Sequence, residues 1–118
     1  MILRRMKTYT GGQGYVYQYY FVGQRPTSSA GEPVTEYIFD VTSDRKTTYS
    51  VSVFLPQQAV QGWAAQHGRN LTDAEQYGAV KLRLFRGFDE IEDLQSHGRR
   101  LTVDPSTLEQ VLTELGVD

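Results

Sequence analysis

Apolar and polar residues alternate along two neighbouring segments of the chain, residues 37–41 and 49–55. Every odd position in them is apolar: Tyr37, Phe39, Val41, Tyr49, Val51, Val53 and Leu55. This period of two is typical of antiparallel strands with one buried face. Because paired residues point to the same face of a sheet, the pattern predicts a hairpin that pairs odd positions, with Phe39 beside Val51.

The connection between these strands must hold an odd number of residues if odd positions are to pair. Pairing Ser43 with Thr47 leaves residues 44–46 as a three-residue loop. A five-residue loop is the alternative, since residues 44–46 contain no glycine for the left-handed position that such loops often need.

The segment from Tyr15 to Val22 is rich in aromatic and β-branched residues, which favour strands. It follows the glycine-rich residues 11–14, so we expect a first hairpin whose other strand lies within residues 2–9. Large apolar side chains occupy both faces of this tyrosine-rich strand, and both faces must therefore be at least partly covered. Residues 24–33 contain two prolines, two serines and a glycine, a composition that predicts a long loop.

The period changes from two to about 3.6 after Leu55, which indicates helices. Residues 56–67 form the first, with Gly68 as its left-handed stop. Thr72 and Glu75 form a capping box that opens a second helix to about residue 95. Residues 80–84 also alternate with period two, so a short strand is the alternative there. Residues 101–103 read as a short extended piece, and residues 104–116 predict a last helix with proline at its first position.

These elements predict one α+β domain spanning residues 1–118. We expect an antiparallel β-meander of three to four strands, followed by two to three helices packed on one face. A chain of 118 residues can bury a sizeable core without crosslinks, and with no cysteine it has none. The sequence therefore excludes a disulfide framework and thiolate chemistry.

Charge and hydropathy narrow the functional classes. The chain has 12 basic and 14 acidic residues, for a net charge of −2, which argues against broad attraction to nucleic acid or anionic lipid. The first residues lack the apolar run of a secretory signal, and no segment approaches the ~20 apolar residues of a membrane span. We expect a cytoplasmic protein that does not bind membranes and has no cofactor.

Acidic residues cluster near residue 90, and Asp89, Asp93 and His97 would share one face of a helix that reached this far. Carboxylates with an imidazole suit a divalent cation, and a metal-dependent enzyme is one interpretation. A solvated acidic face, with Arg86 paired to Asp89 or a neighbour, explains the cluster more simply. His67, in the last turn of its helix, is better explained by the helix dipole than by catalysis.

The tyrosine-rich strand is the feature with the clearest functional meaning. Tyrosine is enriched at protein interfaces because it provides a large, rigid contact with a polar tip. The interface candidates are Tyr15, Tyr17, Tyr19, Tyr20 and Phe21. The alternative is a single-strand nucleic-acid binder that stacks bases on these rings and contacts phosphates with Arg4, Arg5, Lys7 and Arg25.

The sequence thus favours a small non-enzymatic interaction or regulatory module. The expected partner is a second copy of the chain or another protein, because helices of this length cover one face of the sheet but not two. Nucleic-acid binding is the second interpretation, and a metal-dependent enzyme is the third.

Overall fold

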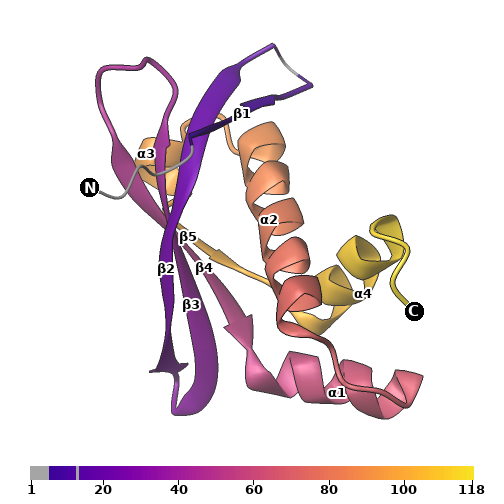
Figure 1. Ribbon diagram of the computed structural model, residues 1–118. Helices are drawn as coiled ribbons and strands as arrows, with labels where there is room; N and C mark the ends of the chain where they lie inside the picture. The colour runs from indigo at the N-terminus through magenta and orange to yellow at the C-terminus, as the bar shows by residue number, and fades with distance from the viewer. Residues whose placement is uncertain (1–5, 13) are drawn as a thin grey trace.

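The computed structural model describes residues 6–12 and 14–118. It contains one five-stranded sheet in the order β1-β2-β3-β4-β5 (Figure 1). The strands are β1 (Lys7–Thr10), β2 (Val16–Ser29), β3 (Glu32–Thr42), β4 (Tyr49–Pro56) and β5 (Arg100–Thr102). The first four form an antiparallel meander, and β5 pairs in parallel with β4.

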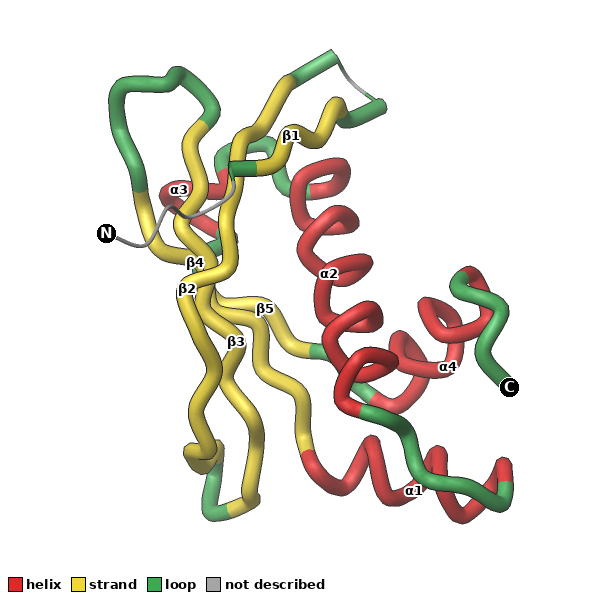
Figure 2. The backbone as a smooth tube through the Cα atoms, in the orientation of Figure 1, coloured by secondary structure: helices red, strands yellow, loops and turns green. Residues whose placement is uncertain are grey.

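The helices are α1 (Gln57–His67), α2 (Asp73–Glu90), α3 (Leu94–His97) and α4 (Pro105–Glu114). The three longer helices, α1, α2 and α4, lie on the same side of the sheet (Figure 2). The predicted α+β fold is therefore confirmed, with one strand more than the three to four expected. Of the helices in the described part of the chain, none is both long and apolar enough to cross a lipid bilayer.

The predicted β3–β4 register is confirmed, since Phe39 pairs with Val51 and Val41 with Tyr49. The predicted three-residue loop is wrong, because pairing ends at Val41 and Tyr49 and Ser43 does not pair with Thr47. The Asp44 carboxylate explains the longer loop. Its Oδ1 accepts hydrogen bonds from the backbone N–H groups of residues 46 and 47, both at 2.8 Å, and these replace the pairing of backbone groups between strands.

Residues 24–33 are not a loop, which corrects the expectation from their composition. β2 continues to Ser29 and β3 begins at Glu32, joined by the two-residue turn Ala30-Gly31. Both turn residues have positive φ, 52° and 80°, as a type I′ turn requires. Pro26 is tolerated because no described strand pairs with the outer edge of β2 at this point.

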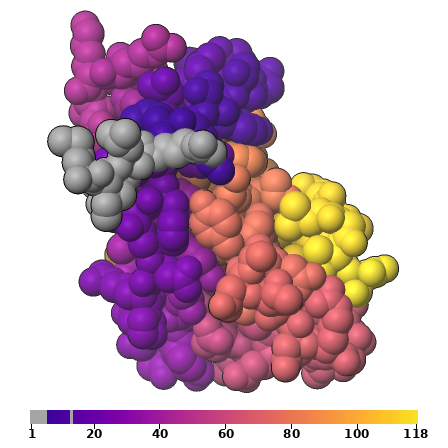
Figure 3. All heavy atoms as spheres, viewed as in Figure 1, coloured from indigo at the N-terminus to yellow at the C-terminus, as the bar shows by residue number. Residues whose placement is uncertain are grey.

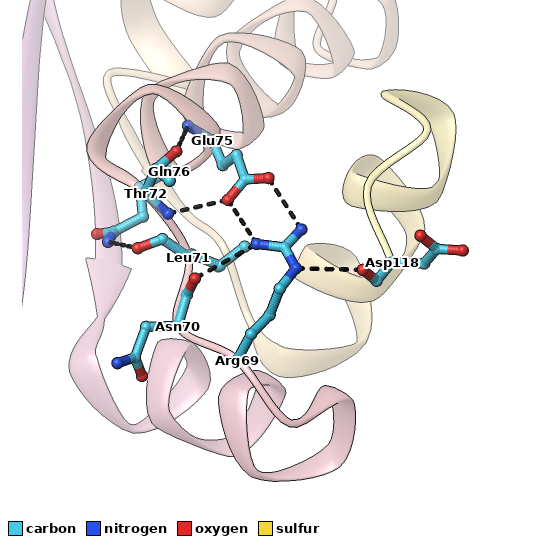
Figure 4. A network of polar contacts seen from close by, with 7 residues as sticks. All are labelled: Arg69, Asn70, Leu71, Thr72, Glu75, Gln76 and Asp118. Carbon is cyan, nitrogen blue, oxygen red and sulfur yellow. Dashed lines mark hydrogen bonds and ion pairs between the residues drawn. The ribbon is translucent and has the colours of Figure 1, made fainter.

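Local capping signals are confirmed. The Thr72 hydroxyl accepts the N–H of Glu75, and the Glu75 carboxylate accepts the N–H of Thr72 in return. Arg69 adds two hydrogen bonds of 2.9 Å to the same carboxylate and reaches the carbonyl of Asp118 (Figure 4). This network joins the α1–α2 connection to the C-terminal residue.

Residues 80–84 are helical, so the helix interpretation of this segment is confirmed. α2 nevertheless ends at Glu90 and not near residue 95, because Ile91 adopts an extended conformation with ψ of 112°. Asp93 then begins the separate one-turn helix α3 by accepting the N–H of Ser96. The last helix begins as predicted, with Asp104 as its cap and proline at its first position.

The core lies between the helices and the odd-numbered face of the sheet. Tyr17 stacks on Phe88 of α2 with ring centroids 4.3 Å apart, and Tyr19 contacts the same ring from 6.0 Å. Figure 3 shows α2 between the first strands on one side and α4 on the other. One face of the tyrosine-rich strand is therefore covered by α2.

Candidate functional site: the uncovered face of the sheet

The face of the sheet opposite the helices carries exposed apolar side chains. None of the three long helices packs on it (Figure 1). Val16 and Val22 remain 43% and 38% exposed there, on either side of the half-buried Tyr20. Val22, two residues beyond Tyr20, is the extra residue of a β-bulge, since the β2–β3 register shifts between Phe21 and Gly23. We call Val16, Tyr20, Val22 and Ile38 the β2 patch.

A carboxylate lies beside the β2 patch. Asp40 accepts the hydroxyl of Tyr20 on Oδ2 at 2.8 Å and the hydroxyl of Ser50 on Oδ1 at 3.3 Å. Each oxygen of this carboxylate therefore has a donor, which compensates for its partial removal from water. The hydrogen bond from its hydroxyl holds the Tyr20 side chain against Asp40 of β3.

A second carboxylate, Glu36, lies four residues earlier on the same face of β3 and is only 7% exposed. Its Oε2 accepts the Ser52 hydroxyl at 2.6 Å and its Oε1 accepts Nε of Arg25 at 2.8 Å. The hydrogen bonds from Ser52 and Arg25 lower the pKa of Glu36, although burial works against them. Glu36 is therefore an ionised structural acceptor and not a general base, which would need a raised pKa.

The same face contains a hollow of about 370 Å³, which we call the sheet hollow. It is lined by Ser29, Glu32, Val34, Phe54, Pro56, Gln58, Arg100 and Thr102. The guanidinium carbon of Arg100 lies 4.7 Å from the centre of the Phe54 ring, a cation–π contact. Sequence reasoning missed this hollow, because no local pattern places β5 beside β4.

A smaller hollow of about 150 Å³ lies between α1 and the start of α4. Trp63 lines it and stacks on His67, with ring centroids 4.2 Å apart. Nε2 of His67 lies 3.1 Å from both carboxylate oxygens of Glu109. Trp63 is buried, and its Nε1 has no acceptor among residues 6–12 and 14–118. These contacts join α1 to α4.

The five predicted interface residues do not share one surface. Tyr17 and Tyr19 are each 4% exposed beneath α2, and Phe21 packs on Tyr77 with ring centroids 5.1 Å apart. Tyr15, which is 52% exposed, and Tyr20 remain accessible. Alternation along β2 places Tyr20 on the face opposite Tyr17, Tyr19 and Phe21, whereas Tyr15 precedes the strand.

The residues of the nucleic-acid interpretation are also separated. Arg4 and Arg5 lie outside the described residues. Lys7 pairs with Tyr19 and points to the helical side of the sheet. It lies near Lys81 there, and burial together with the charge of Lys7 lowers the pKa of Lys81. Arg25 lies on the opposite face and is bound to Glu36.

The predicted arrangement of Asp89, Asp93 and His97 on one helix face is wrong, because α2 ends before Asp93. Asp89 instead accepts the hydroxyl of Tyr9 at 2.7 Å and the backbone N–H of Gly12 at 3.1 Å. Throughout the described residues, no group of three or more histidine or acidic side chains is arranged to hold a metal ion. Arg86 does not form the expected pair either, since it contacts Gln110 and Glu114 on α4.

No protein-family model, curated protein or solved structure matches the chain.

Proposed function

We propose that this protein is a non-enzymatic interaction module that forms a homodimer through the uncovered face of its sheet, centred on Tyr20. The observation that carries the proposal is the β2 patch. Two exposed valines flank Tyr20 on a face without a helical cover. Exposed apolar side chains grouped on one face of a protein can mark an interaction site.

A second copy is the partner that best fits the patch. The face carries both signs of charge, with Arg25 paired to Glu36 and the Asp40 carboxylate bonded to two hydroxyls. A two-fold contact buries the same patch on both copies. Burying Arg25, Glu36 and Asp40 needs no charged partner from the second copy, because each already has a partner within its own chain. Tyrosine at the centre suits such a contact, because its ring is rigid and its hydroxyl is already bonded to Asp40.

Sedimentation of matched variants tests the proposal. We expect the unmodified protein to sediment as a dimer at high micromolar concentration and Val22→Lys to give a folded monomer, because the contact would bury an ammonium group without a partner. Leu115→Lys is the control, since Leu115 is 43% exposed on the helical side of the molecule. A monomeric unmodified protein, or equal dissociation by both variants, would contradict the homodimer.

Nucleic-acid binding is less well supported as a function. Tyr17 and Tyr19 are buried against Phe88, so they are not available to stack on bases. The remaining accessible rings are apart, since Tyr15 precedes β2 and Tyr20 lies within it. Titration of a short single strand at low salt distinguishes the two functions, because we expect no binding at tens of micromolar.

A further inference from the structure

The sheet hollow has the size and the lining of a small-molecule site. Its volume of about 370 Å³ falls in the range of ligand pockets, roughly 300–1,000 Å³. Val34 and Phe54 are 4% and 9% exposed and, with Pro56, give it an apolar floor. Polar groups line the remainder. A pocket with an apolar floor and a few polar groups is the usual form of a specific site.

One of these polar groups is the guanidinium cation of Arg100. Arg100 contacts the Phe54 ring, but no residue in the described part of the chain accepts a hydrogen bond from its guanidinium. It lies near enough to Glu36 to help lower the pKa of that carboxyl. Both oxygens of Glu36 are nevertheless taken by Arg25 and Ser52. Arg100 is therefore available for the carboxylate of a ligand, which guanidinium groups bind through paired hydrogen bonds.

Glu32, the first residue of β3, adds a negative charge to the lining of the hollow. Oε2 of Glu32 accepts a hydrogen bond from the side-chain amide of Gln58 at 2.8 Å, whereas Oε1 accepts none from the other described residues, so this carboxylate can accept a further donor. Gln58 lies in the first turn of α1, so this hydrogen bond holds Glu32 against the helix.

Strand geometry sets the separation of the two charges. Arg100 lies over Phe54, which pairs with Glu36, and Glu32 is four residues from Glu36 along β3. Four residues of strand span about 13 Å, and Arg100 and Glu32 both line the hollow. A peptide of two to three extended residues, at about 3.3–3.6 Å each, spans about 7–11 Å.

We propose that the sheet hollow binds a short zwitterionic peptide of two or three residues. Its C-terminal carboxylate contacts Arg100, its N-terminal ammonium contacts Glu32, and an apolar side chain lies over Val34 and Phe54. A free amino acid is too short to reach both charged residues. A ligand with anionic groups at both ends is repelled by Glu32.

Calorimetric titration of the intact protein with the tripeptide alanyl-alanyl-leucine tests this proposal. Its N-acetylated form, its C-terminal amide and free leucine are the comparison ligands. We expect the tripeptide to bind, and each of the three comparison ligands to bind about tenfold more weakly or less, because each lacks one charge-assisted hydrogen bond or the length to make both. Absence of tripeptide binding at millimolar concentration, or equal binding of the acetylated form, would overturn it.

Variants assign the two ends of the ligand. Arg100→Gln and Glu32→Gln should each weaken tripeptide binding about tenfold, and Glu32→Gln should abolish the preference over the acetylated form. Arg45→Gln, in the exposed β3–β4 loop, is the matched control and should bind as the unmodified protein does. Equal loss in Arg45→Gln and Arg100→Gln would refute the site. The proposal does not depend on self-association, and Val22→Lys should bind the tripeptide whether or not the unmodified protein dimerises.

Discussion

The hydroxyl of Tyr9 donates a 2.7 Å hydrogen bond to Oδ2 of Asp89, a residue 80 positions later in the chain. The other oxygen of the same carboxylate accepts the backbone N–H of Gly12 at 3.1 Å. A side chain at Gly11 would meet this carboxylate, since a Cβ there would lie 2.9 Å from Oδ1. The C-terminal turn of α2 thus fastens the β1–β2 hairpin. Asp89, which the sequence suggested as a metal ligand, has a structural role here.

Asp89→Ala should lower the free energy of unfolding by about 1–3 kcal/mol, because it removes an acceptor from two donors at once. Glu92→Ala is the control, since Glu92 is exposed and close in sequence. Urea unfolding followed by circular dichroism measures both. Equal stability of the two variants would show that the carboxylate does not fasten the hairpin.

The hydrogen bond to Asp89, together with burial and the negative charge of Asp89, raises the pKa of Tyr9 from 10.0 to about 12. A group whose pKa is raised in the folded state adds stability below its unfolded pKa and loses it as pH rises through the folded value. The unfolding free energy of the unmodified protein should therefore exceed that of Tyr9→Phe by a constant amount below pH 10. This difference should shrink between about pH 10 and 12. Unfolding at a series of alkaline pH values measures it, and a constant difference throughout would contradict the prediction.

The contribution of Glu75 to stability should depend on pH in the opposite sense, with its loss at acid pH. The hydrogen bonds from Arg69 and from the backbone of Thr72 lower the pKa of Glu75 from 4.5 to about 2. Its contribution to stability is present above pH 4.5 and is lost as pH falls toward 2. Melting temperatures of the unmodified protein and Glu75→Gln should differ near neutral pH and converge between these values. Parallel curves down to pH 2 would show that the network in Figure 4 does not act on stability.

Ala30 occupies a left-handed position in the β2–β3 turn, with φ of 52°. Glycine adopts this conformation without the clash of a Cβ, so Ala30→Gly should stabilise the protein by about 0.5–1 kcal/mol. The same change at the exposed, helical Ala65 should destabilise it by about 1 kcal/mol. Denaturant midpoints of the two variants should move in opposite directions, and a shift in the same direction would contradict the turn assignment.

Val51 and its neighbour Ser50 test which face of β4 is buried. Val51 is fully buried opposite Phe39, whereas Ser50 is exposed on the uncovered face. Val51→Asn should cost about 3–5 kcal/mol, because it buries an amide without partners and loses apolar contacts. Ser50→Asn should change stability by less than about 1 kcal/mol. Similar midpoints in guanidinium chloride would contradict the face assignment.

Much of the fold could be predicted from local patterns. The register of Phe39 with Val51 follows from apolar residues at every second position, since a slip of one residue would expose the whole buried set. The starts of α2 and α4 could be predicted because Thr72 and Asp104 cap groups only three residues away. Gly68 ends α1 with φ of 74°, as predicted.

The sequence by itself determined the strands at residues 37–41 and 49–55, their register and the helix caps, because each depends on residues within a few positions of one another. It did not determine that residues 24–29 continue β2. Only the tertiary structure decided which face of β2 is covered, and so it placed Tyr17 beneath Phe88 but Tyr20 beside Asp40. It also decided the parallel pairing of β5, which brings Arg100 over Phe54. These contacts join residues 20 to 71 positions apart, and such pairings depend on how complete elements pack, which no local periodicity encodes.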